Sequence, residues 1–150
     1  MARGMDTRSS TYEQDFYAWA RAQAAVLRAA RPNSFDWEHI AEELEATGRG
    51  ERDQMESRIR QILLHLLKWQ FQPWLRSRSW RNSLLVQRRD LAKLLRRNPS
   101  LRPHLQEALA EEYPAAVALA LDETGLPDGA FPASCPYSAE QVQDQGFLPD

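Results

Sequence analysis

ERDQMESRIRQILLHLLKWQFQ, residues 51–72, is the stretch that decides the fold, and it contains neither proline nor glycine. On a helix at 100° per residue, its central polar side chains fall in one stripe. The stripe consists of Arg58, Gln61, His65, Lys68 and Gln72. The remaining circumference is mostly apolar and carries Ile59, Ile62, Leu63, Leu64, Leu66, Leu67 and Phe71. Because a surface helix has a narrower apolar face, we predict a central helix over about 51–72 that is packed on two or three sides.

The segments around this stretch also carry helix signals. The spacing of apolar residues predicts helices over about 12–30, 36–47, 79–97 and 100–124, the last one continuing through a proline. Ser10 and Thr11 are expected to cap the first helix, and Gly48 is expected to end the second. Ser138 and Gln141 form a capping box for one further short helix. We therefore predict an all-α, compact single-domain bundle of five main helices plus a short C-terminal helix.

The predicted domain organisation is simple. Residues 1–9 are expected to be a disordered leader, and residues 10–150 to form a single helical domain. The last part of that domain, residues 126–150, contains several prolines and is expected to be a tail docked on the helices through its aromatic residues.

Several classes of protein are excluded by composition. A single cysteine, Cys135, cannot form an intrachain disulfide or a multi-cysteine zinc site. The N-terminus lacks the apolar core of a secretory signal, and the apolar runs are too short to cross a bilayer. We expect a soluble cytoplasmic protein with no membrane partner.

The charges are segregated along the chain, although the net charge is only −2. Residues 76–102 carry nine Arg or Lys and one acid, hence +8, whereas residues 103–150 carry nine acids and no Arg or Lys, hence −9. The basic segment offers candidate contacts to a polyanion or a partner: Arg76, Arg78, Arg81, Arg89, Lys93 and Arg96. The alternative is that the arginines at 76–97 face acidic side chains of the same chain, and this internal pairing is our prediction.

A possible metal site and the single cysteine are the two further features that bear on chemistry. His39, Glu43 and His65 could supply two imidazoles and a carboxylate to zinc or iron, but their spacing matches no recognised metal motif. Cys135 lacks a nearby basic residue in the sequence that would activate its thiol, which favours an inert cysteine. We therefore expect no catalytic residue, no metal and no cofactor. Gln70, by contrast, falls among apolar positions, so we predict that it is buried and hydrogen-bonded.

The order of motifs resembles the bacterial family known as domain of unknown function 29. The matching stretches are YEQDFYAWA at 12–20, DWEHIAEELEATGR at 36–49, LLHLLKWQFQP at 63–73, SRSWRNSL at 77–84, PSLRPHLQEAL at 99–109, ETGLP at 123–127, FPASCPYSAEQV at 131–142 and FLPD at 147–150. The resemblance covers about residues 12–150 and implies an all-helical domain with no known activity. One departure is Gly50, where the family pattern has serine, and this weakens the predicted cap of the central helix.

These observations favour a small non-enzymatic, cytoplasmic protein-interaction (adaptor) domain whose partner is a protein. The alternative is nucleic-acid binding through the basic helix 76–97. A third hypothesis is an enzyme or metal protein of undetermined chemistry. The sequence leaves the identity of any partner open.

Overall fold

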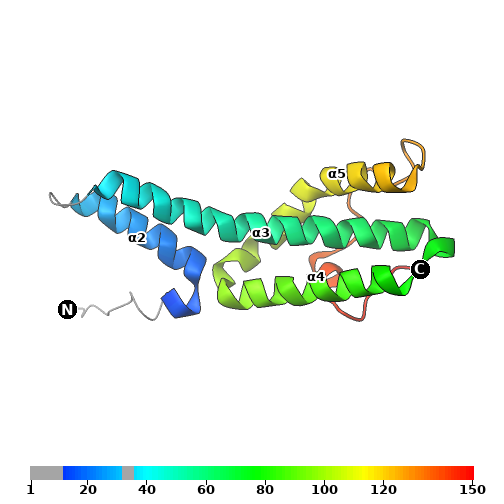
Figure 1. Ribbon diagram of the computed structural model, residues 1–150, viewed down its shortest axis with the longest axis horizontal. Helices are drawn as coiled ribbons and strands as arrows, with labels where there is room; N and C mark the ends of the chain where they lie inside the picture. The colour runs from blue at the N-terminus through cyan, green and yellow to red at the C-terminus, as the bar shows by residue number, and fades with distance from the viewer. Residues whose placement is uncertain (1–11, 32–35) are drawn as a thin grey trace. The chain divides into compact units, whose positions relative to one another are not determined.

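The computed structural model describes residues 12–31 and 36–150. These residues form long helices, two short 3₁₀ helices and no strand, so the predicted all-α class is confirmed (Figure 1). The helices are α2 (Phe16–Ala30), α3 (Trp37–Phe71), η1 (Pro73–Leu75), α4 (Arg78–Arg97), η2 (Pro99–His104), α5 (Leu105–Thr124) and α6 (Ala139–Gln143). The expected leader at 1–9 and the expected caps Ser10 and Thr11 lie outside the described residues.

The described residues fall into two compact units. The first contains residues 12–31, 36–54 and 94–102, and the second contains residues 55–93 and 103–150. Helix α3 thus gives its first half to one unit and its second half to the other, and α4 is divided in the same way near its C-terminal end. The prediction that residues 10–150 are one domain remains a prediction.

The predicted break at Gly48 is wrong, because α3 continues through it as one helix of 35 residues. The predicted helix at 36–47 and the central helix at about 51–72 are therefore one element, and the five main helices become four. Gly48 is buried, and a Cβ built on it would lie 3.4 Å from the Cβ of Ala20. The glycine thus permits α2 to approach α3 closely and does not end the helix.

Small residues hold the first unit together where α2 lies along the first half of α3 (Figure 1). Ala20, Ala24 and Ala41 have no exposed surface. A buried network closes the unit at the end of α4. The side-chain amide of Asn98 donates to a Glu51 carboxylate oxygen at 2.6 Å, and its carbonyl oxygen accepts from the Tyr17 backbone N–H at 2.8 Å. Because Asn98 is fully buried with its polar atoms paired, it avoids the cost of an unsatisfied amide.

The second half of α3 is the core of the second unit, as predicted for the central helix. Leu63, Leu66 and Leu67 have no exposed surface. Phe71, at the end of the helix, is only half-buried and meets Phe131 edge to face, with ring centroids 5.3 Å apart. Gln72, which was placed in the polar stripe, is buried instead. It follows α3 directly, so the helical periodicity behind the prediction no longer applies there.

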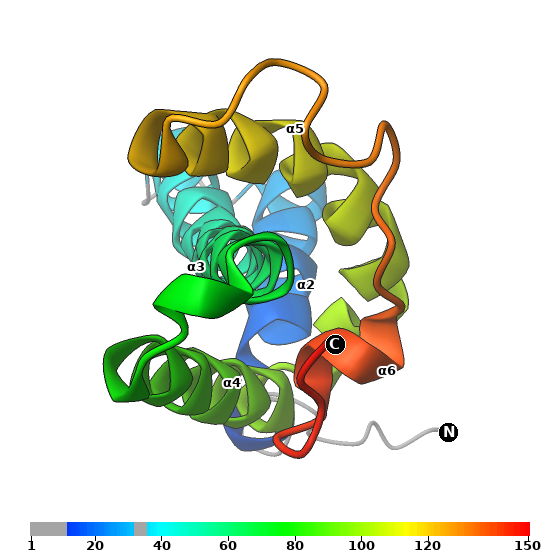
Figure 2. The same ribbon diagram turned by 90° about the vertical axis from the view of Figure 1, so that its right-hand side faces the viewer.

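The elements after α4 largely follow the predicted pattern. Helix α5 contains Pro114 and ends at Gly125, whose φ of 69° suits a residue without a Cβ. The capping box of Ser138 and Gln141 starts α6, as predicted. The segment that follows lies beside α4 (Figure 2), and the backbone oxygen of Phe147 in this segment accepts a hydrogen bond from Arg88 of α4.

Candidate functional site

The six candidate contact residues are not equivalent in the structure. Arg78, Arg89 and Lys93 are exposed on α4 within the second unit. Arg96 is also exposed but belongs to the first unit. Arg76 and Arg81 both contact Trp69, with their guanidinium carbons 5.0 and 5.6 Å from its ring centroid. Arg76 also donates to the backbone oxygen of Trp69 at 2.8 Å, so its role is structural and it is not free for a partner.

The predicted internal charge pairing of the arginines at 76–97 is wrong for most of them. Among the described residues, only Arg89 and Arg97 of this group lie within 4 Å of a carboxylate, Arg89 at 3.9 Å from Asp90 and Arg97 at 3.7 Å from Glu51. Acids of α5 pair instead with cations of α3, Glu112 with Arg60 and Glu123 with Lys68, each at 2.7 Å. The sequence shows where the charges are concentrated, but the packing of the helices determines which cations lie next to which acids.

Arg88, which is not among the candidates, is the buried cation that contacts the tail, and Arg76 also donates to the tail, at 3.3 Å from the backbone oxygen of Pro149. It is only 2% exposed and donates to the backbone oxygens of Gln141, Val142 and Phe147 at 2.9, 2.8 and 2.9 Å. The first two carbonyls lie in the last turn of α6, where no intrahelical donor follows. Burial lowers the pKa of the Arg88 guanidinium, and the charge of Asp144 opposes that shift. The helical wheel could have predicted that Arg88 is buried, because Arg88 is one turn from Leu84 and Leu91 on the apolar side of α4.

His65 and Cys135 have local partners. His65 Nδ1 lies 2.8 Å from the backbone oxygen of Gln61, and burial lowers the pKa of this histidine. Across residues 12–31 and 36–150, no three His, Cys, Asp or Glu side chains converge as metal ligands, so the hypothetical set of His39, Glu43 and His65 is not brought together. Cys135 is half-buried beside Tyr137, and burial raises the pKa of its thiol.

Gln70 is half-buried and not fully buried as predicted. Its amide oxygen accepts from the hydroxyl of Tyr137 at 2.7 Å. The hydrogen bond was expected, but its donor comes from the tail and not from a neighbouring helix or from the connector after α3. Burial raises the pKa of Tyr137, which keeps the hydroxyl protonated and able to donate.

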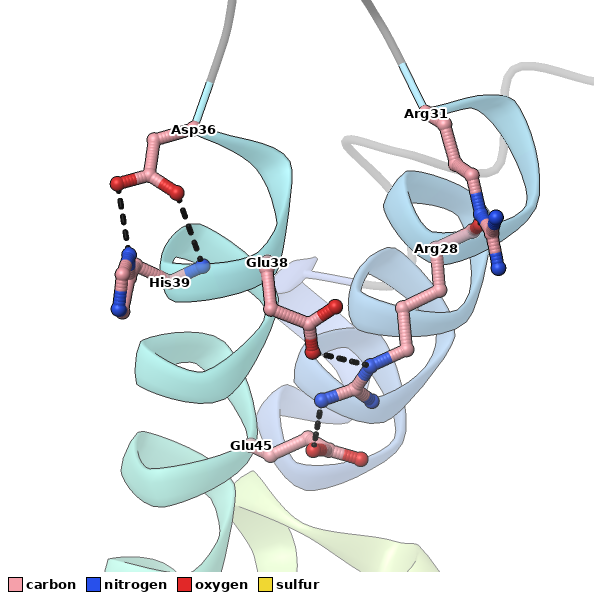
Figure 3. Close-up of polar contacts among 6 residues, drawn as sticks. All are labelled: Arg28, Arg31, Asp36, Glu38, His39 and Glu45. Atoms are coloured by element: carbon pink, nitrogen blue, oxygen red, sulfur yellow. Dashed lines mark hydrogen bonds and ion pairs between the residues drawn. The ribbon is translucent and has the colours of Figure 1, made fainter.

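Polar contacts tie α2 to the start of α3 (Figure 3). Arg28 Nη2 lies 2.7 Å from Glu45 Oε1, and Arg28 Nε lies 3.8 Å from Glu38 Oε1. Its hydrogen bond to Arg28 lowers the pKa of Glu45. Asp36 caps α3 by accepting from the backbone N–H of His39 and also lies 2.7 Å from His39 Nδ1. That contact raises the pKa of His39 and lowers that of Asp36. The contacts of Arg28 with Glu45 and Glu38 therefore join α2 to α3, whereas the contact between Asp36 and His39 caps the start of α3.

The other distinctive surface of the first unit is aromatic. Phe16, Trp19, Gln23 and Val26 follow one another at spacings of three, four and three residues along α2, which is the spacing of a helix–helix seam. Tyr12 packs edge to face on Phe16 and Trp19, with ring centroids 5.7 and 4.8 Å apart. We call these five residues the α2 seam.

The α2 seam is not the side of α2 that packs on α3. The buried residues of α2 are Tyr17, Ala20 and Ala24, roughly 110° around the helix from the seam. Within the seam, Tyr12 is 51% and Val26 is 58% exposed, and the other three residues are half-buried. Arg97 lies with its guanidinium carbon 5.5 Å from the centroid of Phe16. Phe16, Trp19 and Val26 of α2 therefore remain at least partly in contact with solvent, whereas Tyr17 is buried.

The described residues form a small helical protein, and a solved structure to which the chain is similar is also helical. The chain belongs to the family described as "Domain of unknown function DUF29", whose model matches residues 11–148. It is similar to a crystal structure of an alpha-helical protein of unknown function from Rhodospirillum rubrum ATCC 11170, with 28% identity and a TM-score of 0.72 over 91% of each chain. The comparison with curated proteins gives no match. No helix among the described residues is long and apolar enough to span a membrane.

Proposed function

We propose that the protein is a non-enzymatic, cytoplasmic interaction domain and that the α2 seam is the surface that binds another polypeptide. The observation that carries this proposal is the exposure of a helix–helix seam. A helix in a finished bundle buries its large apolar residues, whereas α2 buries Tyr17 and two alanines and leaves Val26 more than half exposed, as is Tyr12 just before the helix.

The composition of the seam also fits a protein partner. Binding energy at protein interfaces is concentrated in tryptophan, tyrosine and arginine, and this surface combines Trp19, Tyr12 and the neighbouring Arg97. The three aromatic rings already pack on one another, so little side-chain freedom is lost on binding. The spacing of the seam matches a helix of the partner laid along α2.

Site-specific photo-crosslinking in the source cell tests the proposal. A benzophenone amino acid at Val26 is expected to give one discrete adduct, whose mass tells a second copy of this chain from a different protein. The matched control is Ala25, which is exposed on the same helix but lies roughly 140° from the centre of the seam. Equal adducts from both positions, or no discrete adduct from Val26, would exclude the seam as a docking surface.

A further inference from the structure

The exposed side of α4 carries positive charge, and among the described residues the one carboxylate within 4 Å of its cations is Asp90, at 3.9 Å from Arg89. Six exposed residues fall within a 100° arc of this helix inside the second unit. They are Arg78, Asn82, Leu85, Val86, Arg89 and Lys93, and we call them the α4 face. The face is roughly 22 Å long, since each residue of a helix adds about 1.5 Å.

The cations of the α4 face are available to a partner. Arg78 and Lys93 form no ion pair with any described residue, and the one contact of Arg89, at 3.9 Å from Asp90, leaves its side chain 70% exposed. Asp90 is the acid at the edge of the face, and it is also 3.8 Å from Arg58 of α3. Like charges on one helix face repel one another, and a complementary acidic surface would remove that repulsion.

The centre of the face is apolar. Leu85 is 50% and Val86 is 39% exposed, and they lie between Arg78 on one side and Arg89 and Lys93 on the other. Next to Val86 the surface is hollowed, with a volume of about 550 Å³ lined by Arg78, Ser79, Asn82, Ser83, Val86 and Gln87. An apolar centre ringed by charge is the pattern of a protein interface.

We infer that the α4 face binds an acidic amphipathic helix of a protein partner, with leucine-like side chains on Leu85 and Val86 and carboxylates on the flanking cations. A protein helix fits the face better than nucleic acid, because the exposed apolar residues of the face, Leu85 and Val86, are aliphatic and offer no aromatic ring for a base to stack on. The exposed Trp74 lies in η1, before α4, and is not part of the face. This inference concerns the second unit and does not depend on the α2 seam.

A binding titration with a synthetic helix tests the inference. The probe is a fluorescein-labelled, alanine-based peptide of about five helical turns. Leucines at i, i+3, i+4 and i+7 form its apolar centre, and glutamates lie on the same face toward both ends of the peptide. A peptide of the same composition with the leucines spread around the helix is the first control. We expect saturable binding of the amphipathic peptide, at least about tenfold tighter than binding of the control peptide.

Variants of the protein locate the binding. Arg89→Glu and Lys93→Glu are each expected to weaken binding about tenfold, and Leu85→Ser about fivefold. Arg102→Glu makes the same charge change at an exposed residue of η2 that is not part of the face and belongs to the first unit, and it is expected to have little effect. Circular dichroism checks that each variant stays helical.

Three results would overturn the inference. One is the absence of saturable binding of the amphipathic peptide. The second is tighter binding of a labelled single-stranded oligonucleotide than of the peptide, together with a tenfold loss of oligonucleotide affinity in Arg89→Glu. That result would assign the face to nucleic acid. The third is peptide binding that Arg102→Glu weakens as much as Arg89→Glu does, which would show unspecific charge attraction. Crosslinking from Val26 is unaffected by any of these results, so the two proposals fail separately.

Discussion

Replacing Arg88 with methionine is expected to release the C-terminal segment from the second unit. Methionine keeps much of the length and the apolar packing of the side chain but removes all three hydrogen bonds to Gln141, Val142 and Phe147. A hydrogen bond that involves a charged group contributes about 1.5–3 kcal/mol, so three would sum to about 4.5–9 kcal/mol. Water can reach the carbonyls once the segment detaches, which limits the loss. We therefore expect the free energy of unfolding to fall by about 3–5 kcal/mol, less than the sum of the three hydrogen bonds.

Urea denaturation and hydrogen exchange measure this effect together. Arg88→Met should lower the urea midpoint and remove exchange protection from residues 138–150, while the centre of α3 stays protected in the folded state. The matched control is Arg89→Met, because the neighbouring arginine is 70% exposed and has only a 3.9 Å contact with Asp90. Its expected cost is below about 0.5 kcal/mol. Equal midpoints for the two variants, or unchanged protection of 138–150 in Arg88→Met, would refute the role assigned to Arg88.

Three further predictions follow from single contacts. Gly50→Ala should raise the free energy of unfolding by about 0.5–1 kcal/mol in urea denaturation, because an added Cβ there meets nothing within 4 Å. Gly48→Leu should lower the free energy of unfolding by about 1–3 kcal/mol, because the larger side chain forces α2 away from α3. A Gly48→Leu variant that is more stable than the wild type would contradict the close approach of the two helices. Burial raises the pKa of Cys135, so its thiol should react with a disulfide reagent at pH 8 about tenfold or more slowly in the native protein than in urea, and equal rates would refute its protection. Asp36→Asn should return the pKa of His39 toward its ordinary value in an NMR titration, and an unmoved pKa would rule out the contact. Because the folded pKa of His39 is raised, its contribution to stability is fully present below the unfolded pKa of about 6.5 and is lost as pH rises through the folded value.

The sequence predicted those parts of the fold that depend on short-range patterns. The apolar arc that contains Leu63 and Leu67, the capping box at Ser138 and the continuation of α5 through Pro114 all involve residues within a few turns of one another. Gly48 was misread because a glycine that ends a helix and a glycine that lets another helix approach look alike in sequence. Only the position of Ala20, on a different helix, distinguishes the two.

The candidate site was harder to predict, because it depends on contacts between distant segments. Total charge suggested that the arginines of α4 face the acidic tail, yet Arg88 binds backbone carbonyls, which carry no sequence signal. In α2, the helical spacing of Phe16, Trp19 and Val26 is the spacing of any apolar face. It does not reveal that the packed side consists of Tyr17, Ala20 and Ala24, because the close contact between α2 and α3 determines which side is buried.

The central claim is that the α2 seam docks on a partner, and the accessibility of position 26 in living cells tests it most directly. Val26→Cys in a Cys135→Ser background is to be labelled with a membrane-permeant maleimide, both in the source cells and in the purified protein. Ala25→Cys in the same background is the control for thiol reactivity and reagent entry. The account predicts that position 26 is labelled at least about tenfold more slowly than position 25 in cells, because a partner covers the seam. In the purified protein the two positions react equally when the partner is a different protein, and position 26 stays slower when the partner is a second copy of this chain. Equal labelling of the two positions in cells would contradict it.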